Sequence, residues 1–144
     1  MQLRGILETA IYVDDLDAAQ DFYGRVLGLD LISRDRNRHV FFRCGEGVFL
    51  IFNPAVTANE PATVNGASVP PHGASDAGHM AFRVREDELP GWRARLEREH
   101  VPIESEIAWP RGGRSIYFRD PAGNSIELAS PRLWGFAEDS PETC

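Results

Sequence analysis

The amino-acid sequence predicts an α+β fold made of two βαβββ modules within one domain of 144 residues. Two observations lead to this prediction. The pattern of residues 8–13 returns at 79–84, and that of residues 40–52 ("VFFRCGEGVFLIF") returns in the same order at 116–128 ("IYFRDPAGNSIEL"), which indicates a duplicated unit. Each copy also combines one stretch of helical period with several stretches that alternate like strands.

The first module begins with a strand, which the alternation predicts at residues 5–13. Apolar residues then recur at helical spacing through 16–28, where Asp14 or Asp15 can cap the first turn and Gly28 permits a left-handed exit. Three further strands are expected at residues 29–34, 39–44 and 48–53.

The second module repeats this order with a strand at 79–84 and a helix within 86–100. Pro90 and Gly91 should shorten or delay that helix, because proline fits only the first turn. The remaining strands are expected at residues 102–107, 114–119 and 124–129.

These elements divide the chain into two modules, the segment that joins them and a tail. The joining segment is rich in Pro, Gly, Ala, Ser and Asn, and is too long for an ordinary connection, so we interpret it as a linker or a lid loop. The expected parts are module one at about 1–53, the linker or lid at 54–78, module two at about 79–130 and the C-terminal tail at 131–144.

Composition excludes several classes of protein. The formal net charge is -7, and the basic residues are scattered among acidic ones, which argues against nucleic-acid binding. The chain has no apolar run long enough for a membrane span and no signal-peptide pattern. The two cysteines, Cys44 and Cys144, form no pair with ligand spacing. We therefore expect a cytoplasmic protein with reduced thiols.

Three side chains with metal-binding groups are predicted on one side of the sheets. Successive side chains of a strand point to opposite faces. Glu127 therefore points to one face, and Ile126 and Leu128 point to the other, where they can pack against a helix. The same reasoning places Glu8 and His79 on the helix-free side. Three ligands leave coordination positions open, as a catalytic metal site requires. The alternative is that each of these polar side chains is simply solvated.

These residues lie within motifs that resemble the vicinal oxygen chelate superfamily, which includes glyoxalases, bleomycin and fosfomycin resistance proteins and extradiol dioxygenases. The motifs are "ETAIYVDDLDAAQDFYGRVLGLDL" near the start, "GHMAFRV" in the middle and "GGRSIYFRDPAGNSIEL" near the end. The last is the most specific. The resemblance covers nearly the whole chain to about Ser130.

The resemblance implies a curved, cup-like mixed sheet with helices on its outer face, surrounding one divalent metal ion. Glu8, His79 and Glu127 fall on ligand positions of the family, whereas Ile51 stands where four-ligand glyoxalases usually have another ligand. The resemblance also implies a homodimer that acts on a small molecule. Whether Glu8 serves its own chain or a partner is left open.

Glu8 in place of a family histidine favours Lewis-acid chemistry of the lyase, isomerase or transferase type. Two carboxylates and one imidazole suit Mn, Ni, Fe, Zn or Mg, and leave the metal unidentified. Glu8 or Glu127 could then also carry a proton to or from the substrate. Two alternatives stay open, an extradiol ring-cleaving dioxygenase and a metal-free binding protein of the bleomycin-resistance type.

Four residues are candidates for contact with the substrate. Tyr117 and Trp109 are aromatic side chains close to the expected site, and Arg114 follows a flexible "GG" pair and could hold an anionic group. His72 lies in the long loop at 54–78 and could fold over the site.

Overall fold

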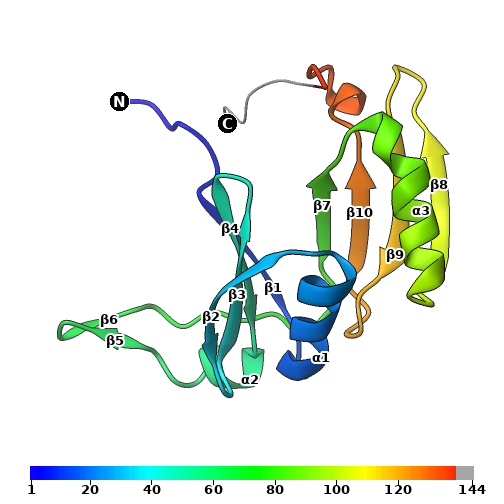
Figure 1. Ribbon diagram of the computed structural model, residues 1–144. Helices are drawn as coiled ribbons and strands as arrows, with labels where there is room; N and C mark the ends of the chain where they lie inside the picture. The colour runs from blue at the N-terminus through cyan, green and yellow to red at the C-terminus, as the bar shows by residue number, and fades with distance from the viewer. Residues whose placement is uncertain (139–144) are drawn as a thin grey trace. The chain divides into compact units, whose positions relative to one another are not determined.

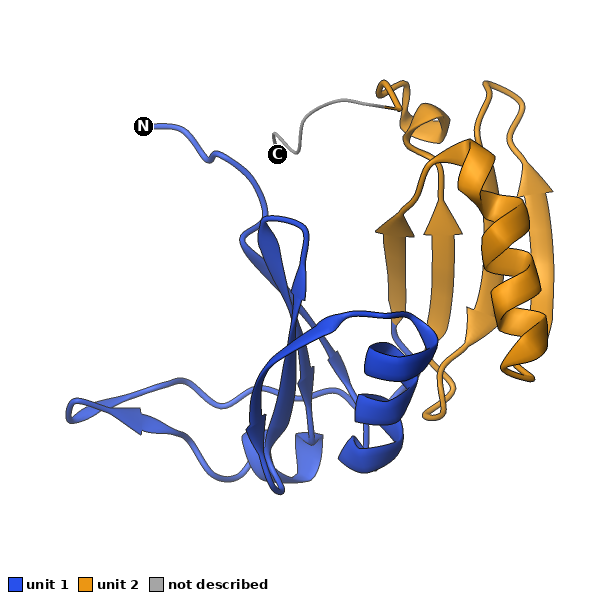
Figure 2. Ribbon diagram, in the orientation of Figure 1, with its two compact units in different colours: residues 1–78 blue, residues 79–144 orange. Residues whose placement is uncertain are grey.

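The computed structural model of the chain describes residues 1–138. They form two compact units whose boundary in the sequence lies between Gly78 and His79 (Figure 2). The last six residues of the expected C-terminal tail lie outside the described part.

The first unit contains a four-stranded mixed sheet in the order β1-β4-β3-β2 (Figure 1). The strands β1 and β4, which come first and last of the four along the chain, are neighbours in the sheet and run parallel. The other pairs are antiparallel. The strands are β1 (Glu8–Tyr12), β2 (Asp30–Asp35), β3 (His39–Cys44) and β4 (Gly47–Phe52).

The helix that follows β1 is α1 (Leu16–Asp21), which continues as a π-helical turn over Phe22–Val26. Asp15 provides the cap, because its side-chain oxygen accepts hydrogen bonds of 3.0 Å from the backbone N–H groups of Asp17 and Ala18. Such a cap stabilises a helix by about 1 kcal/mol. Apolar side chains of this helical segment are buried in the unit's core, including Tyr23, whose ring packs edge-on against Phe49 at 5.0 Å.

The segment between the modules contains short regular elements. It begins with α2 (Pro54–Thr57) and continues into a hairpin of β5 (Thr63–Val64) and β6 (Ala67–Ser68). Asn65 and Gly66 both have positive φ, 49° and 81°, as the turn of a two-residue hairpin requires.

The second unit repeats the sheet in the order β7-β10-β9-β8, again with the first and last strands parallel (Figure 1). A short 3₁₀ turn (Glu86–Glu88) precedes α3, in which Pro90 occupies the first turn as predicted. The elements are β7 (His79–Arg83), α3 (Leu89–Arg98), β8 (Ile103–Ala108), β9 (Arg114–Arg119), β10 (Ser125–Ala129) and a 3₁₀ helix (Pro131–Trp134).

The helix α3 covers one face of the second sheet. Arg93 of α3 forms an ion pair with Glu106 of β8, and the Cα partner of Glu106 is Ile116 of β9. Paired residues point to the same side of a sheet. The helix therefore lies over the face that carries Ile116 and the fully buried Phe118. We call the other face of this sheet, which α3 does not cover, the helix-free face.

The predicted α+β fold of two βαβββ modules, each with a mixed sheet, is confirmed by these elements. The bounds of β3 and β9 match the expected ranges, and most other elements are shorter than expected. The expected single helix over 16–28 is an α-helical turn followed by a π-helical one.

Candidate functional site

The helix-free face of the second sheet brings together His79, Tyr117 and Glu127. Glu127 of β10 is the Cα partner of Tyr117 on one side and of Ala81 on the other, and His79 is the partner of Ser125. All three named side chains therefore point away from α3. The residues next to Tyr117 and Glu127 along their strands are buried and apolar and those of β7 are half-buried, which fixes the register of the strands.

His79 and Glu127 face each other across β7 and β10. The distance from His79 Nε2 to Glu127 Oε2 is 3.4 Å, and the Glu127 side chain is 8% exposed whereas that of His79 is 54% exposed. The Nδ1 atom of His79 lies 3.1 Å from the backbone oxygen of Ser125. A carbonyl oxygen only accepts hydrogen bonds, so Nδ1 is the donor in this contact, and Nε2 is the ring nitrogen that faces Glu127.

Tyr117 lies beside both residues. Its ring stacks on that of His79 with centroids 6.3 Å apart and planes 20° apart. Burial, together with hydrogen bonding to Glu127 and the negative charge of Glu127, raises the pKa of the Tyr117 phenol to about 12. Tyr117 is therefore a neutral hydrogen-bond donor to this carboxylate at ordinary pH.

Trp109 is connected to the same group through Ser115. The indole Nε1 donates a hydrogen bond of 2.8 Å to Ser115 Oγ, and Ser115 in turn hydrogen-bonds to Tyr117, which slightly offsets the rise in its pKa. Ser115 is buried and was not identified from the sequence. A serine between Arg114 and Ile116 of a strand gave no signal by itself.

Glu8 belongs to the first unit, where it begins β1 and is exposed. Its Cα partner is Val48 of β4. Among residues 1–138, no place gathers three His, Cys, Asp or Glu side chains that could hold a metal. Of the three predicted ligands, the structure thus brings together His79 and Glu127.

Sheet register corrects one correspondence between the modules. An ungapped alignment places Glu127 over Ile51, but the sheet pairing gives Leu50 the equivalent place: Leu50 pairs with Ala10 and Phe41, as Glu127 pairs with Ala81 and Tyr117. Ile51 faces the core and is fully buried. The equivalent position in module one is apolar in either alignment.

His72 contacts the face of the first sheet that carries Tyr12 and Phe52. Its Nδ1 lies 2.9 Å from the hydroxyl of Tyr12, and its ring packs against Phe52 with centroids 4.6 Å apart. His39 and Phe41 stack beside Phe52, with ring centroids 3.9 Å apart. We call these five residues the aromatic cluster of the first unit; sequence reasoning named only His72 as a candidate for substrate contact.

The structure separates Arg114 from the other candidates. Arg114 alternates with Ser115 along β9, so its side chain is on the face of Ile116 and Phe118, opposite Tyr117. Its backbone N–H is bonded to Ser130 Oγ. This placement speaks against contact between the Arg114 side chain and a molecule bound beside Glu127.

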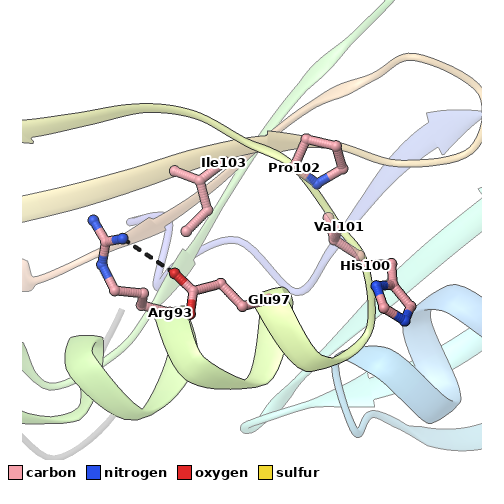
Figure 3. Close-up of a pocket in the computed structure, with 6 residues that line it drawn as sticks. All are labelled: Arg93, Glu97, His100, Val101, Pro102 and Ile103. Atoms are coloured by element: carbon pink, nitrogen blue, oxygen red, sulfur yellow. Dashed lines mark hydrogen bonds and ion pairs between the residues drawn. The ribbon is translucent and has the colours of Figure 1, made fainter.

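A hollow of about 390 Å³ lies beside α3 in the second unit (Figure 3). Its lining residues are Arg93, Glu97, His100, Val101, Pro102 and Ile103. Arg93 is engaged by Glu97 and Glu106. Ile103 of the lining is the Cα partner of Phe118, so the hollow is on the face that α3 covers, and His79 and Glu127 are on the other face.

Within the described residues, no helix is both long and apolar enough to cross a membrane.

Two βαβββ units with an imidazole and a carboxylate on the helix-free face define a class of protein, and the sequence comparison agrees. Residues 5–128 match the model of the Glyoxalase/Bleomycin resistance protein/Dioxygenase superfamily, and the chain belongs to this superfamily.

Individual relatives give a finer comparison. The chain is 32% identical over 130 residues to the glutathione transferase FosA of Serratia marcescens, an alignment that covers 88% of this chain and 80% of the relative. The crystal structure of lactoylglutathione lyase from Agrobacterium tumefaciens is 42% identical, with a TM-score of 0.85 over 92% of this chain and 97% of that one. The fosfomycin resistance protein FosX of Mesorhizobium loti shares the fold, with a TM-score of 0.61 at 20% identity over 90% of this chain and 93% of that one.

The donor groups of the second unit suit a divalent metal ion, which members of this superfamily typically use. Metal-binding histidines usually donate their second ring N–H to a backbone carbonyl or a carboxylate, and His79 does so to Ser125. The adjacent Glu127 supplies a charged oxygen, so the two residues offer an imidazole nitrogen and a carboxylate oxygen to the same point.

Proposed function

We propose that the protein is a metal-dependent enzyme that acts on a small oxygen-bearing substrate by lyase-, isomerase- or transferase-type chemistry, with Glu8, His79 and Glu127 as metal ligands. The observation that carries this proposal is the pair of His79 and Glu127, in which Nε2 of the imidazole lies 3.4 Å from an oxygen of a nearly buried carboxylate while Nδ1 is bonded to the backbone. Glu8, from the same chain or from a second copy, completes the set of three.

A bound divalent cation would supply Lewis-acid polarisation of two neighbouring substrate oxygens. The protein's own residues do the rest. Glu127 and Glu8 are carboxylates that can accept a proton from the substrate and return it. Burial of Glu127 limits the access of water to its oxygens, which strengthens its electrostatic interactions.

Two relatives support a substrate linked to glutathione. One is named a glutathione transferase and the other a lactoylglutathione lyase, and both names include glutathione. We infer that this chain acts on a compound of the same class, either as a glutathione adduct or together with glutathione. His72 is proposed to contact such a substrate.

The experiment that tests the metal site is elemental analysis of protein purified without chelator or metal-carrying affinity tag. The parent is expected to hold near-stoichiometric divalent metal, and Glu127→Gln and His79→Ala are expected to lose it. Glu97→Gln is the matched control, because it makes the same charge change on the α3 face, where Glu97 pairs with Arg93.

Each outcome of the metal measurement has a distinct meaning. Iron as the bound metal would favour the ring-cleaving dioxygenase over Lewis-acid chemistry. Absence of metal, even after incubation with Mn, Ni, Fe, Zn or Mg, would refute the enzyme proposal and favour a metal-free binding protein that uses the aromatic cluster.

We further propose that the protein works in the cytoplasm as a homodimer, as superfamily members commonly pair. Light scattering coupled to gel filtration measures the assembly, and a mass of one chain would contradict the dimer.

A further inference from the structure

We propose that Tyr117, held in place by Ser115 and Trp109, is a positioning residue that fixes the carboxylate of Glu127 for metal binding. This inference rests on the proposed function, because it concerns the same metal site. It assigns roles to three residues that do not themselves have to contact the metal or the substrate.

The direction of the hydrogen bonds is the first argument. An indole N–H can only donate, so Ser115 Oγ must accept from Trp109, at 2.8 Å. Hydrogen bonding with Ser115 lowers the pKa of Tyr117 and hydrogen bonding with Glu127 raises it, which is the pattern expected when Ser115 donates to the Tyr117 oxygen and Tyr117 donates to Glu127. An ionised carboxylate only accepts, so the chain of donors ends correctly at Glu127. Hydrogen bonds aligned in this way polarise and strengthen one another.

Burial of Glu127 is the second argument. Its side chain is 8% exposed, and a buried carboxylate needs hydrogen-bond partners to offset the loss of water. Tyr117 is directly opposite Glu127 in the ladder of β9 and β10. Its hydroxyl can therefore restrain the rotation of the carboxylate, so that Oε2 stays beside Nε2 of His79.

The duplicated module supplies an internal comparison. At the place equivalent to Glu127 the first unit has Leu50, and opposite Leu50 it has Phe41 instead of a tyrosine. The hydroxyl of the aromatic ring is thus absent where the carboxylate is absent. This difference is expected if the hydroxyl of Tyr117 serves the carboxylate, since the two modules otherwise share their strand order and register.

The test compares Co²⁺ binding by the parent, Tyr117→Phe, Ser115→Ala and Ser115→Thr. Isothermal titration gives the affinity, and the visible absorption of bound Co²⁺ reports its coordination. Tyr117→Phe is expected to weaken Co²⁺ binding by about 10–100-fold, as loss of an outer-shell partner typically does, and to change the absorption bands. Ser115→Ala should have a smaller effect in the same direction, and Ser115→Thr, which keeps the hydroxyl, should restore the parent's affinity and spectrum.

The outcomes separate the two proposals. If the parent and Tyr117→Phe bind Co²⁺ with equal affinity and identical spectra, the positioning role is wrong while the metal site stands. If the parent binds no Co²⁺, the metal site and the positioning role both fail. Thermal unfolding of the metal-free variants controls for loss of fold: a Tyr117→Phe protein that melts with the parent but binds Co²⁺ weakly supports the inference. Should Tyr117→Phe fail to fold, the Ser115→Ala and Ser115→Thr pair decides, because equal affinities in that pair contradict the role.

Discussion

Replacement of Asp120 by alanine should destabilise the second unit strongly, because this side chain organises the turn that leads into β10. Asp120 is 4% exposed. Its Oδ1 accepts hydrogen bonds from the backbone N–H groups of Ala122 at 3.0 Å and Asn124 at 2.8 Å, and its Oδ2 accepts from Asn124 Nδ2 at 2.9 Å. The turn between β9 and β10 thus depends on one carboxylate.

The magnitude follows from the groups that lose their acceptor. Ala122 is exposed, so its N–H can bond to water instead. Asn124 is only 2% exposed, so loss of the Asp120 acceptor leaves its two donors, the backbone N–H and Nδ2, without water to replace it. Each of these lost hydrogen bonds lowers the stability by about 1–3 kcal/mol. We expect Asp120→Ala to lower the free energy of unfolding by about 4 kcal/mol. Asp120→Asn keeps one oxygen but places an NH₂ group toward Asn124, and should cost about 2 kcal/mol.

Urea unfolding followed by tryptophan fluorescence measures this effect. The three tryptophans all lie in the second unit, so their emission reports on the unit that contains Asp120. With a slope of about 1–3 kcal/mol per M urea, the midpoint of Asp120→Ala should fall by at least about 1 M. Asp87→Ala, which removes an exposed carboxylate paired with Arg85, is the control and should leave the midpoint unchanged. If Asp120→Ala shifts the midpoint no more than Asp87→Ala does, the assignment of the turn's stability to Asp120 is wrong.

Two further predictions concern the same unit. Gly113 and Gly123 share a φ of +86°, but an added Cβ would lie 2.5 Å from Leu133 N at Gly113 and would meet nothing within 4 Å at Gly123. In the same urea assay, Gly123→Ala should therefore lower the free energy of unfolding by about 1–2 kcal/mol, and Gly113→Ala by about 1–3 kcal/mol more. Equal losses of stability in the two variants would contradict the packing argument. The pKa of the Tyr117 phenol is raised from 10.0 to about 12 in the fold. The neutral phenol therefore stabilises the fold below pH 10, and this contribution is lost as the pH rises through about 12. Ultraviolet titration of the parent against Tyr117→Phe checks this, and a difference spectrum of tyrosinate formation near pH 10 would disprove it.

The elements with strong local signals could be predicted from the sequence. Alternation indicated the faces of Glu127 and His79, because a strand between buried apolar residues has only one register that keeps them inside. The cap at Asp15 and the delayed start of α3 at Pro90 followed from local chemistry in the same way.

Features that depend on turn length or on distant contacts could not be predicted. The strands β3 and β4 are joined by a tight turn, with Cys44 paired to Gly47, whereas β9 and β10 are joined by a longer one between Arg119 and Ser125. An alignment without gaps ignores this difference, and its error of one residue exchanges Leu50 for Ile51, which points to the opposite face. Similarly, the contact of Trp109 with Ser115 depends on side-chain conformation, which a linear pattern does not contain.

Parallel pairing of the first and last strands in each unit has a consequence for folding during synthesis. His79 and Ser125 are direct neighbours in the sheet although 46 positions separate them in the chain, and contacts of such long range form late because their loop-closure entropy must be met first. A nascent chain that ends before β10 carries His79 on a strand whose neighbour does not yet exist. The pairing of His79 with Glu127 is therefore completed only when the last strand of the second unit has left the ribosome, so truncated chains should lack this pair altogether.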